Sequence, residues 1–198
     1  MTVLAIALSY FIGSISTAYI VVKALKGIDI RTVGSGNAGA TNVKRVLGTG
    51  PAIVVLALDI LKGILAVYIG RWAGGEMLSL ACGVAVVVGH NWPLFFGLKG
   101  GKGSATSLGV ILTVSPLITI LVLIIGVGTI AVTKYVSLGS IIVAPIYVIA
   151  MAITYRTMRH TIFALILASM VLYRHRENIV RLFEGRESKL GDTIKKVK

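Results

Sequence analysis

Three glycines and several small polar residues lie together in the segment GSGNAGATNVKR, residues 34–45. Glycines at this density let several backbone N–H groups converge on one anion, as in a nest or at a helix N-terminus. If a helix begins near Ala38, Thr41 and Arg45 lie on one face of it, four residues apart. The alternative is a flexible membrane loop, in which Gly, Ser and Asn are common. The candidate ligand-binding residues are Gly34, Ser35, Gly36, Asn37, Thr41, Asn42 and Arg45.

A second glycine-rich turn occurs in GLKGGKGSATS, residues 97–107. A Gly-Gly-Lys-Gly turn followed by Ser and Thr at a helix start has the chemistry of a phosphate cradle. It is not a Walker A loop, because Lys102 is followed by Gly103 and no strand precedes it, so ATP hydrolysis is not indicated. Alternatively, Lys99 and Lys102 are charges that only set membrane topology. The candidate residues are Gly100, Gly101, Lys102, Gly103 and Ser104.

Two further polar segments follow apolar runs. In KYVSLGS, residues 134–140, Ser137 and Ser140 place two hydroxyls beside a positive charge. In YRHRENIVRL, residues 173–182, His175 and Asn178 are three apart and therefore on one helical face. The alternative for the second segment is an ordinary basic stop after a membrane helix. All four side chains are candidates for contacts to an anionic substrate.

Few acidic residues are present to act as bases or metal ligands. Before the tail that follows Tyr173, the only acids are Asp29, Asp59 and Glu76. No paired carboxylates are placed to hold Mg²⁺, and a single cysteine excludes a multi-cysteine metal site. A His-x4-Asp acyltransferase dyad is also missing, because the fifth residue after His90 is a phenylalanine. We therefore predict no metal, no cofactor, and a site rich in donors but poor in general bases.

The composition places these polar segments in a membrane protein. Of the 198 residues, 56% are hydrophobic and only 14% are charged, whereas a soluble domain carries about 25% charged residues. A formal net charge of +13 would suggest nucleic acid on a soluble protein, but here the basic residues lie between or after apolar runs. They are interpreted as membrane-flanking and anion-binding charges, and nucleic acid is excluded as a partner.

Apolar runs are distributed along the whole chain, and a bilayer core needs about 20 residues of helix. The runs cover residues 1–22, 51–70, 77–96, 104–132, 136–155 and 161–173. Lys and Arg concentrate between the first two runs, in the loop before Ser104 and after Tyr173. Those segments are therefore predicted to be cytoplasmic, and the N-terminus to be outside.

An outside N-terminus and a cytoplasmic C-terminus require an odd number of crossings. We expect residues 104–155 to contain three, with one boundary near residues 129–139. The expected break positions are Gly126, Gly128, Lys134 and Pro145. The prediction is one all-α polytopic membrane domain, residues 1–198, with about seven transmembrane helices.

Asp59 and Lys62 lie in the middle of an apolar run, and their spacing of three allows them to pair on one helical face. Charges within the membrane, together with basic loops and broken helices, would also suit a membrane carrier or flippase for a phosphorylated solute. An enzyme is favoured over this alternative, because the remaining polar residues cluster at one membrane face.

Taken together, the four polar segments resemble the motifs of one known family. Segments GSGNAGATNVKR (34–45), HNWPLFFGLKGGKGSATSLG (90–109), KYVSLGS (134–140) and YRHRENIVRL (173–182) are similar to those of small bacterial membrane glycerol-3-phosphate acyltransferases that use acyl phosphate. The resemblance extends over essentially the whole chain. It implies seven transmembrane helices and an active site at the cytoplasmic face of the bacterial inner membrane. It also implies formation of lysophosphatidic acid for phospholipid synthesis.

The resemblance further implies residue roles and partners. The residues implied as catalytic are Ser35, Arg45, Lys102, His175 and Asn178, and the other candidates would bind substrate. Acyl phosphate, glycerol 3-phosphate and membrane lipids are the implied partners, with the acyl-phosphate-synthesising enzyme as a further candidate. The glycerol 1-hydroxyl would attack the acyl carbonyl and inorganic phosphate would leave. Because the anhydride is already activated, positioning and electrostatic stabilisation can supply much of the rate.

No protein carboxylate is expected to act as the base. The leaving phosphate, or else His175, is expected to take the hydroxyl proton. Four acids lie near the motifs in loops or in the tail, and each is predicted to tolerate replacement by its amide. They are Asp29, Glu177, Glu184 and Glu187.

Overall fold

The computed structural model describes residues 1–192, and within them every regular element is helical. The chain begins with α1 (Thr2–Ser14) and α2 (Thr17–Lys26), which are separated by a two-residue break. The remaining helices are α3 (Ala40–Leu47), α4 (Thr49–Asn91), α5 (Ser104–Val114), α6 (Pro116–Thr133), α7 (Val136–Tyr155), α8 (Met158–Arg174) and α9 (Arg176–Phe183). Two 3-10 turns, η1 (Ile30–Thr32) and η2 (Leu94–Phe96), lie in loops. Residues 193–198, with Lys195, Lys196 and Lys198 of the predicted cytoplasmic tail, lie outside the described residues.

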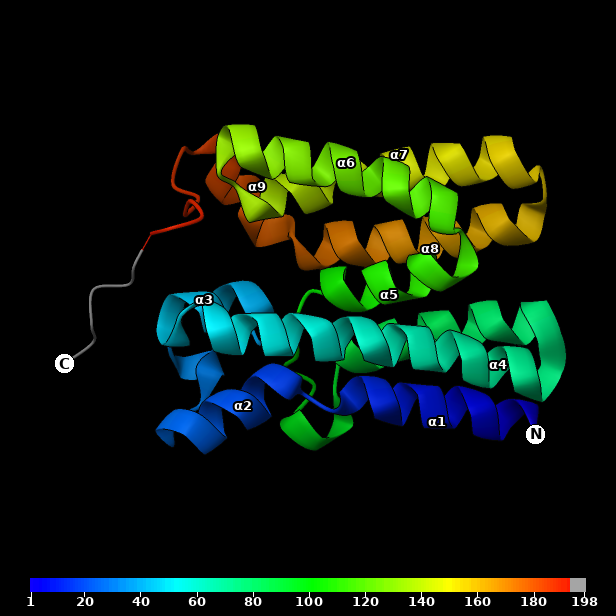
Figure 1. Ribbon diagram of the computed structural model, residues 1–198, viewed down its shortest axis with the longest axis horizontal. Coiled ribbons are helices and arrows are strands. Elements are labelled where there is room, and N and C mark those ends of the chain that lie inside the picture. Colours follow the sequence, from blue (N-terminus) through cyan, green and yellow to red (C-terminus); the bar gives the residue numbers. More distant parts are fainter. Residues whose placement is uncertain (193–198) are drawn as a thin grey trace.

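The long helix α4 folds back on itself at Gly74 and Gly75, as Figure 1 shows. Gly75 has φ +76°, in the left-handed region that favours glycine. The two arms approach closely at Gly70, where a Cβ would press on the backbone of Leu78 and Ser79. The apolar runs predicted on either side of this turn are therefore two antiparallel arms.

Residues 104–155 form three helices, in agreement with the sequence, but most of the expected breaks are wrong. The first break falls at Ser115, which the sequence did not predict. The second falls after α6 at Lys134, within the predicted boundary region, and Lys134 has φ +64°. Gly126 and Gly128 lie inside α6, and Pro145 lies inside α7. Glycine and proline are tolerated inside membrane helices because neighbouring groups can satisfy the freed backbone.

Helix α5 has 11 residues, which is about 16 Å of helix and about half the thickness of a bilayer core. It packs against α4 at two glycines. A Cβ on Gly63 would overlap the carbonyl oxygen of Thr106, and a Cβ on Gly109 would overlap that of Ile60. Small residues of this kind let membrane helices approach closely. The contact holds the start of α5 against α4, next to the polar loops.

Within the described residues, four segments are long and apolar enough to cross a membrane. They are Thr2–Lys26, Thr49–Phe96, Pro116–Thr133 and Val136–Tyr155. Large apolar side chains such as Leu117, Ile124 and Ile153 are exposed on their outer faces, as expected for surfaces that lipid covers. The buried core lies between α4, α5, α6, α7 and α8, around Val86 and Phe163.

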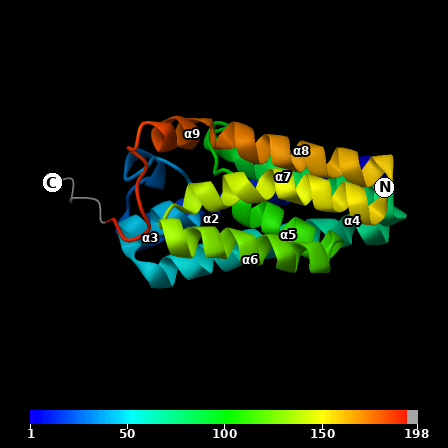
Figure 2. The same ribbon diagram turned by 90° about the horizontal axis from the view of Figure 1, so that it is seen from above.

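The two ends of the helical bundle differ. In Figures 1 and 2, α2, α3, the α6–α7 turn and α9 gather at the end opposite to the N-terminus. The loop between α4 and α5 is tied to α8 there, because the Arg174 guanidinium donates to the carbonyl oxygens of Gly100 (3.1 Å) and Gly101 (3.0 Å). We call this the polar end, and all four polar segments of the sequence lie in it.

Candidate active site

The polar end contains a cavity of about 370 Å³, here called the polar cavity. It is lined by the loop before α3, by α3 itself, by both arms of α4, by the starts of α5 and α7, and by the region around α9. The sequence-predicted residues that line it are Ser35, Asn37, Thr41, Asn42, Arg45, Lys102, Ser104, Ser137, Ser140, His175 and Asn178. The structure therefore brings all four polar segments, and every residue proposed as catalytic, into one cavity.

Asn42 holds the first glycine-rich loop in shape. Its buried side-chain oxygen accepts a hydrogen bond from the backbone N–H of Ser35 (2.9 Å). Its amide nitrogen donates to three backbone carbonyls, those of Ile30 (3.2 Å), Val33 (3.0 Å) and Asn37 (3.1 Å). Both ends of the amide are thus engaged by the protein, so Asn42, although predicted to bind substrate, fixes the loop that presents Ser35.

Helix α3 presents Thr41 and Arg45 to the polar cavity from consecutive turns. The helix begins at Ala40, two residues later than the predicted start near Ala38. The spacing of four nevertheless keeps both side chains on one face, as expected. Arg45 Nη2 donates to the backbone oxygen of Ser188 at 3.3 Å, which leaves further N–H groups of the guanidinium for a ligand.

The predicted substrate-binding glycines Gly34, Gly36, Gly100, Gly101 and Gly103 are not among the residues that line the cavity. They shape the turns that carry the lining residues, and their role in substrate binding stays a prediction. Gly34, Gly36 and Gly103 have φ of +65°, +69° and +79°, a conformation that is costly for other residues. Gly100 and Gly101 pack on the end of α4, where a Cβ would overlap the carbonyl oxygen or the ring of His90. The absence of a side chain at Gly100 and Gly101 therefore lets this turn pack closely against the protein's own backbone and side chains.

Lys102 connects two polar segments directly, because its ammonium donates a hydrogen bond to the amide oxygen of Asn178. Burial, with a further contribution from the positive charge of Arg181, lowers the pKa of Lys102 to about 8. An anion bound beside it would favour the protonated form and raise the pKa again. Lys99, by contrast, is exposed and outside the cavity lining.

His175 is neutral at physiological pH. Burial lowers its pKa to about 4, despite a hydrogen bond from its Nδ1 to the carbonyl oxygen of Val171 at 2.8 Å. The carbonyl can only accept, so Nδ1 carries the proton and Nε2 is an acceptor. His175 can thus accept a hydrogen bond from a substrate hydroxyl, but its low pKa makes it a weak general base.

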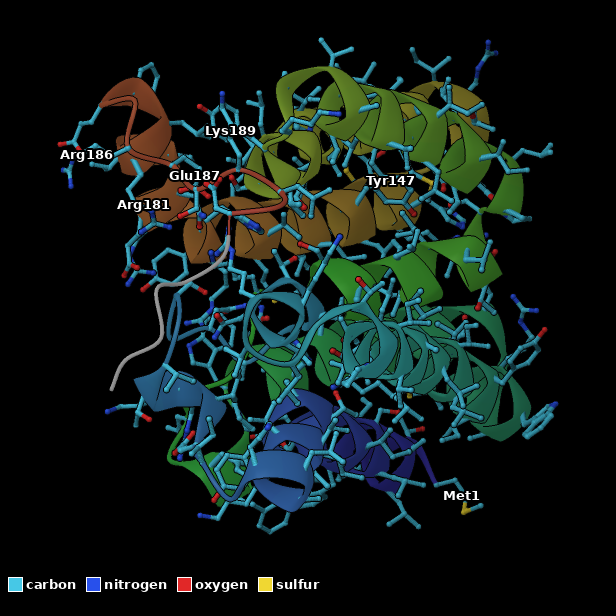
Figure 3. All side chains as sticks on the ribbon, turned by 60° about the vertical axis from the view of Figure 1, so that its left-hand side comes forward. Met1, Tyr147, Arg181, Arg186, Glu187 and Lys189 are labelled. Atoms are coloured by element: carbon cyan, nitrogen blue, oxygen red, sulfur yellow. The ribbon has the colours of Figure 1, made fainter. Side chains whose placement is uncertain are left out.

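Glu187 is a further residue of the site that the sequence did not reveal. Its Oε1 accepts from Ser137 Oγ (2.8 Å) and Asn178 Nδ2 (2.7 Å), and its Oε2 accepts from Arg181 Nε (2.8 Å). Figure 3 shows Arg181 and Glu187 together at the polar end. Burial alone would raise the pKa of Glu187, but these hydrogen bonds outweigh it and lower the pKa. The contacts argue against the expectation that an amide can replace this carboxylate without effect.

Asp59, His90 and Arg181 also line the cavity, although they were not predicted as site residues. The predicted pair of Asp59 and Lys62 is confirmed, with Asp59 Oδ1 and Lys62 Nζ 2.8 Å apart. The spacing of three residues between Asp59 and Lys62 was the feature of the sequence that predicted this pair. Nothing in the sequence relates this pair to the second arm of α4, where His90 lies.

The charges of the polar cavity favour an anionic ligand. Arg45, Lys102 and Arg181 are the cations that line it, and Asp59 and Glu187 are the anions. Both carboxylates already bind cations of the protein, Asp59 through Lys62 and Glu187 through Arg181. Over residues 1–192, no three His, Cys, Asp or Glu side chains are grouped so that they could hold a metal ion.

A second cavity of about 230 Å³, here called the apolar cavity, lies between α5, α6, α7 and α8. Its lining is almost entirely apolar and includes Val122, Val143 and Leu167. Four residues line both cavities, namely Leu56, Ser104, Ala105 and Ser140. Ser104 Oγ donates to Ser140 Oγ at 3.2 Å. The two cavities therefore meet at the starts of α5 and α7.

The fold and the site thus define an all-helical membrane protein that has a cationic cavity beside an apolar one. The profile of the family described as glycerol-3-phosphate acyltransferase matches residues 3–185. The chain belongs to this family, which confirms the resemblance seen in its motifs. It is therefore an acyltransferase-family membrane protein of phospholipid synthesis.

Individual relatives agree with this assignment. The chain is 53% identical, over 96% of each chain, to the glycerol-3-phosphate acyltransferase of Thermoanaerobacter sp. (strain X514). It is 44% identical to that of Halalkalibacterium halodurans, over 92% of each chain. It is also similar to the crystal structure of PlsY (YgiH), an integral membrane glycerol 3-phosphate acyltransferase, in its glycerol 3-phosphate form. That comparison has a TM-score of 0.91, 38% identity, and 96% coverage of each chain. The lysophosphatidic acid form of PlsY gives a TM-score of 0.88.

Proposed function

We propose that the protein transfers a fatty acyl group from acyl phosphate to the 1-hydroxyl of glycerol 3-phosphate, giving lysophosphatidic acid and inorganic phosphate. One observation carries this proposal above all others. The cationic polar cavity and the apolar cavity share Ser104, Ala105 and Ser140, so phosphate groups and a fatty chain can be held on either side of one reacting carbonyl.

The polar cavity holds the phosphate groups of both substrates. Arg45 provides a planar set of donors that matches phosphate oxygens, and Lys102 provides a compact charge. Ser35, Ser137 and Ser140 add hydroxyl donors around the same space. A cavity of about 370 Å³ that is lined by Ser188 and Glu187 of the tail suits two small phosphorylated groups. This supports acyl phosphate as the donor over a thioester with a large carrier.

The apolar cavity holds the part of the acyl chain nearest to the carbonyl. Its lining runs along α7 from Gly139 to Tyr147, a rise of eight residues and about 12 Å of helix. The chain beyond this length would lie among the lipid tails. The proximal methylenes make van der Waals contacts with this lining, which helps to hold the carbonyl at the junction of the two cavities.

In the proposed reaction, the glycerol 1-hydroxyl oxygen forms a bond to the acyl carbon, and the bond from that carbon to the phosphate oxygen breaks. The leaving phosphate takes the hydroxyl proton. His175 Nε2 accepts a hydrogen bond from the neighbouring 2-hydroxyl, which orients the glycerol and leaves the 1-hydroxyl hydrogen for the phosphate, while the pKa of about 4 keeps this ring neutral. Lys102 and Arg45 stabilise the charge on the phosphate groups. No protein carboxylate takes the proton, because Asp59 and Glu187 are engaged by protein cations.

The same proposal includes the membrane topology. Seven passes are obtained by counting α1, the two arms of α4, and α5 to α8, with α5 as a short pass. The polar end bears most of the Lys and Arg residues, so we place it, the active site and the C-terminus on the cytoplasmic side of the bacterial inner membrane, with the N-terminus outside. The whole chain, residues 1–198, then forms a single membrane domain.

A site at one end of the bundle supports an enzyme over a carrier, whose site would lie near mid-membrane.

The donor is tested with detergent-purified protein, glycerol 3-phosphate and either palmitoyl phosphate or palmitoyl-CoA. We expect lysophosphatidic acid with the first donor only. The Lys102→Ala variant serves as the inactive control. Product from palmitoyl-CoA alone would overturn the proposed donor while leaving the family assignment intact.

A further inference from the structure

A cluster of charged side chains is buried beside the polar cavity and is not used by the proposed reaction. Asp59 and Lys62 lie on the first arm of α4, and His90 lies at the end of the second arm. Lys62 Nζ is 2.8 Å from both Asp59 Oδ1 and His90 Nδ1. The side chains of Asp59 and Lys62 are only 1% and 6% exposed. Charges buried to this degree within a membrane helix are costly and need specific partners.

The cluster is tied to the start of the chain. Lys62 Nζ donates to the carbonyl oxygens of Gly13 (3.3 Å) and Ile15 (3.2 Å), at the break between α1 and α2. Thr17 Oγ1, in the first turn of α2, donates to Asp59 Oδ1 at 2.8 Å. The end of α1 and the start of α2 are thus held against the first arm of α4 by the ion pair.

The cluster also determines the orientation of His90. An ammonium group can only donate, so Lys62 requires His90 Nδ1 to be an acceptor and places the ring proton on Nε2. The Nε2 atom faces Gly101, where any Cβ would overlap it. The His90 carbonyl oxygen accepts from the Gly101 N–H at 3.1 Å. The side chain and the backbone of His90 therefore both contact Gly101, the residue that precedes Lys102, and hold it in place.

We propose that Lys62 is a positioning residue for acyl transfer, which acts through His90 to hold the Gly100–Lys102 turn and so the Lys102 ammonium. The inference rests on the proposed function, because it requires Lys102 to act in the polar cavity. The ion pair with Asp59 keeps the Lys62 charge stable where it lies. Asp59 thus supports Lys62, and Lys62 supports His90 and the turn.

A double variant separates positioning from simple stabilisation. Lys62→Met alone leaves the Asp59 carboxylate buried without its ammonium partner, which destabilises the fold. Asp59→Asn with Lys62→Met removes both charges, so the melting temperature should return close to that of the wild type. If Lys62 positions the turn, kcat/KM for glycerol 3-phosphate should still be about 100-fold low, as expected for a displacement of about 1 Å. Glu76→Gln is the control, because it removes an ion pair with Arg159 (2.8 Å) that joins α4 to α8 away from the cavity.

The tautomer of His90 is measured on the wild-type protein, and variants serve only to assign the His90 signal and to perturb it. In protein labelled with ¹⁵N-histidine, the signal lost in His90→Gln should report an Nε2–H ring, and Lys62→Met should shift it. A double variant with wild-type kcat/KM, or a His90 ring with the proton on Nδ1, would overturn the inference. Full activity of Lys102→Ala would instead overturn the proposed function, so the two failures are distinguishable.

Discussion

The Lys102 ammonium donates a hydrogen bond to the amide oxygen of Asn178, 76 residues further along the chain. The same amide donates through its nitrogen to Glu187 at 2.7 Å. One asparagine thus connects the cation at the start of α5 with the carboxylate of the tail. Glu187 also binds Arg181, so these contacts fix the positions of Lys102 and Arg181 around the polar cavity before any substrate binds. The predictions below depend on them.

Lys102→Ala should lose about two to four orders of magnitude in turnover, because it removes a charge-assisted contact to phosphate. Lys99→Ala is the matched control, since Lys99 is exposed and outside the lining of the cavity. Steady-state kinetics on both purified variants make the comparison. Equal losses would mean that general positive charge, not a specific contact, explains the effect.

The pKa of about 8 for Lys102 predicts an alkaline limit to activity. Lys102 carries its charge below this pH and loses it as the pH rises through 8, so kcat/KM, which reports the free enzyme, should fall above pH 8. Lys102→Arg keeps a charged side chain throughout this range. Its profile should therefore stay flat at alkaline pH, even if its maximum is lower. An unchanged alkaline limb in Lys102→Arg would assign the limb to another group.

His175→Asn should retain measurable turnover, because we expect His175 to orient the glycerol rather than to remove the proton of the attacking hydroxyl. The substrate phosphates themselves titrate near pH 6, so the wild type and His175→Asn should share any acid limb in that region. The pH profiles of both proteins are the measurement. An acid limb present only in the wild type, together with an inactive variant, would identify His175 as the base.

Glu187→Gln should lower kcat/KM by about 10- to 100-fold, since it weakens charge-assisted bonds that hold Asn178 and Arg181. Glu184→Gln is the control, because Glu184 pairs with Arg186 at the surface and does not line the cavity. The sequence alone predicted that both changes are tolerated. Wild-type kinetics for Glu187→Gln would support that prediction and would show that the contacts of Glu187 are not needed for activity.

Gly126→Leu should shift acyl specificity towards shorter chains. Gly126 is buried and lines the apolar cavity, and a Cβ there would lie 3.2 Å from Val143 Cγ1. Gly128→Leu is a close control on the same helix, because Gly128 is exposed and has open space around it. Competition between acyl phosphates of two lengths gives a product ratio that is independent of the amount of folded enzyme. Equal ratios in both variants would place the acyl chain outside this cavity.

Much of the site could be predicted from the sequence because local chemistry marks it. Gly-rich turns, a lysine before a helix start, and His175 and Asn178 three residues apart are visible without a fold. The roles of Asn42 and Gly101 could not be predicted, since they depend on which backbone groups lie opposite. Glu187 could not be found either, because only the path of the tail after α9 brings it to Asn178.

The helix boundaries could also be predicted only in part, because they depend on tertiary contacts. The charge pattern required an odd number of crossings and so predicted three in residues 104–155. The break expected at Lys134 is present, whereas those at Gly126, Gly128 and Pro145 are wrong. The additional break is at Ser115, where Ser115 Oγ lies 3.1 Å from the Tyr147 hydroxyl of α7. This contact between residues 32 positions apart is tertiary, and tertiary contacts override local preference at such points.

The most direct test of acyl transfer from acyl phosphate is ³¹P NMR of the purified protein with palmitoyl phosphate and glycerol 3-phosphate. As the signals of both substrates decline, those of inorganic phosphate and lysophosphatidic acid should grow in equal amounts, and Lys102→Ala should show neither. Release of inorganic phosphate without lysophosphatidic acid, or no loss of palmitoyl phosphate while the folded protein is present, would contradict the proposed reaction.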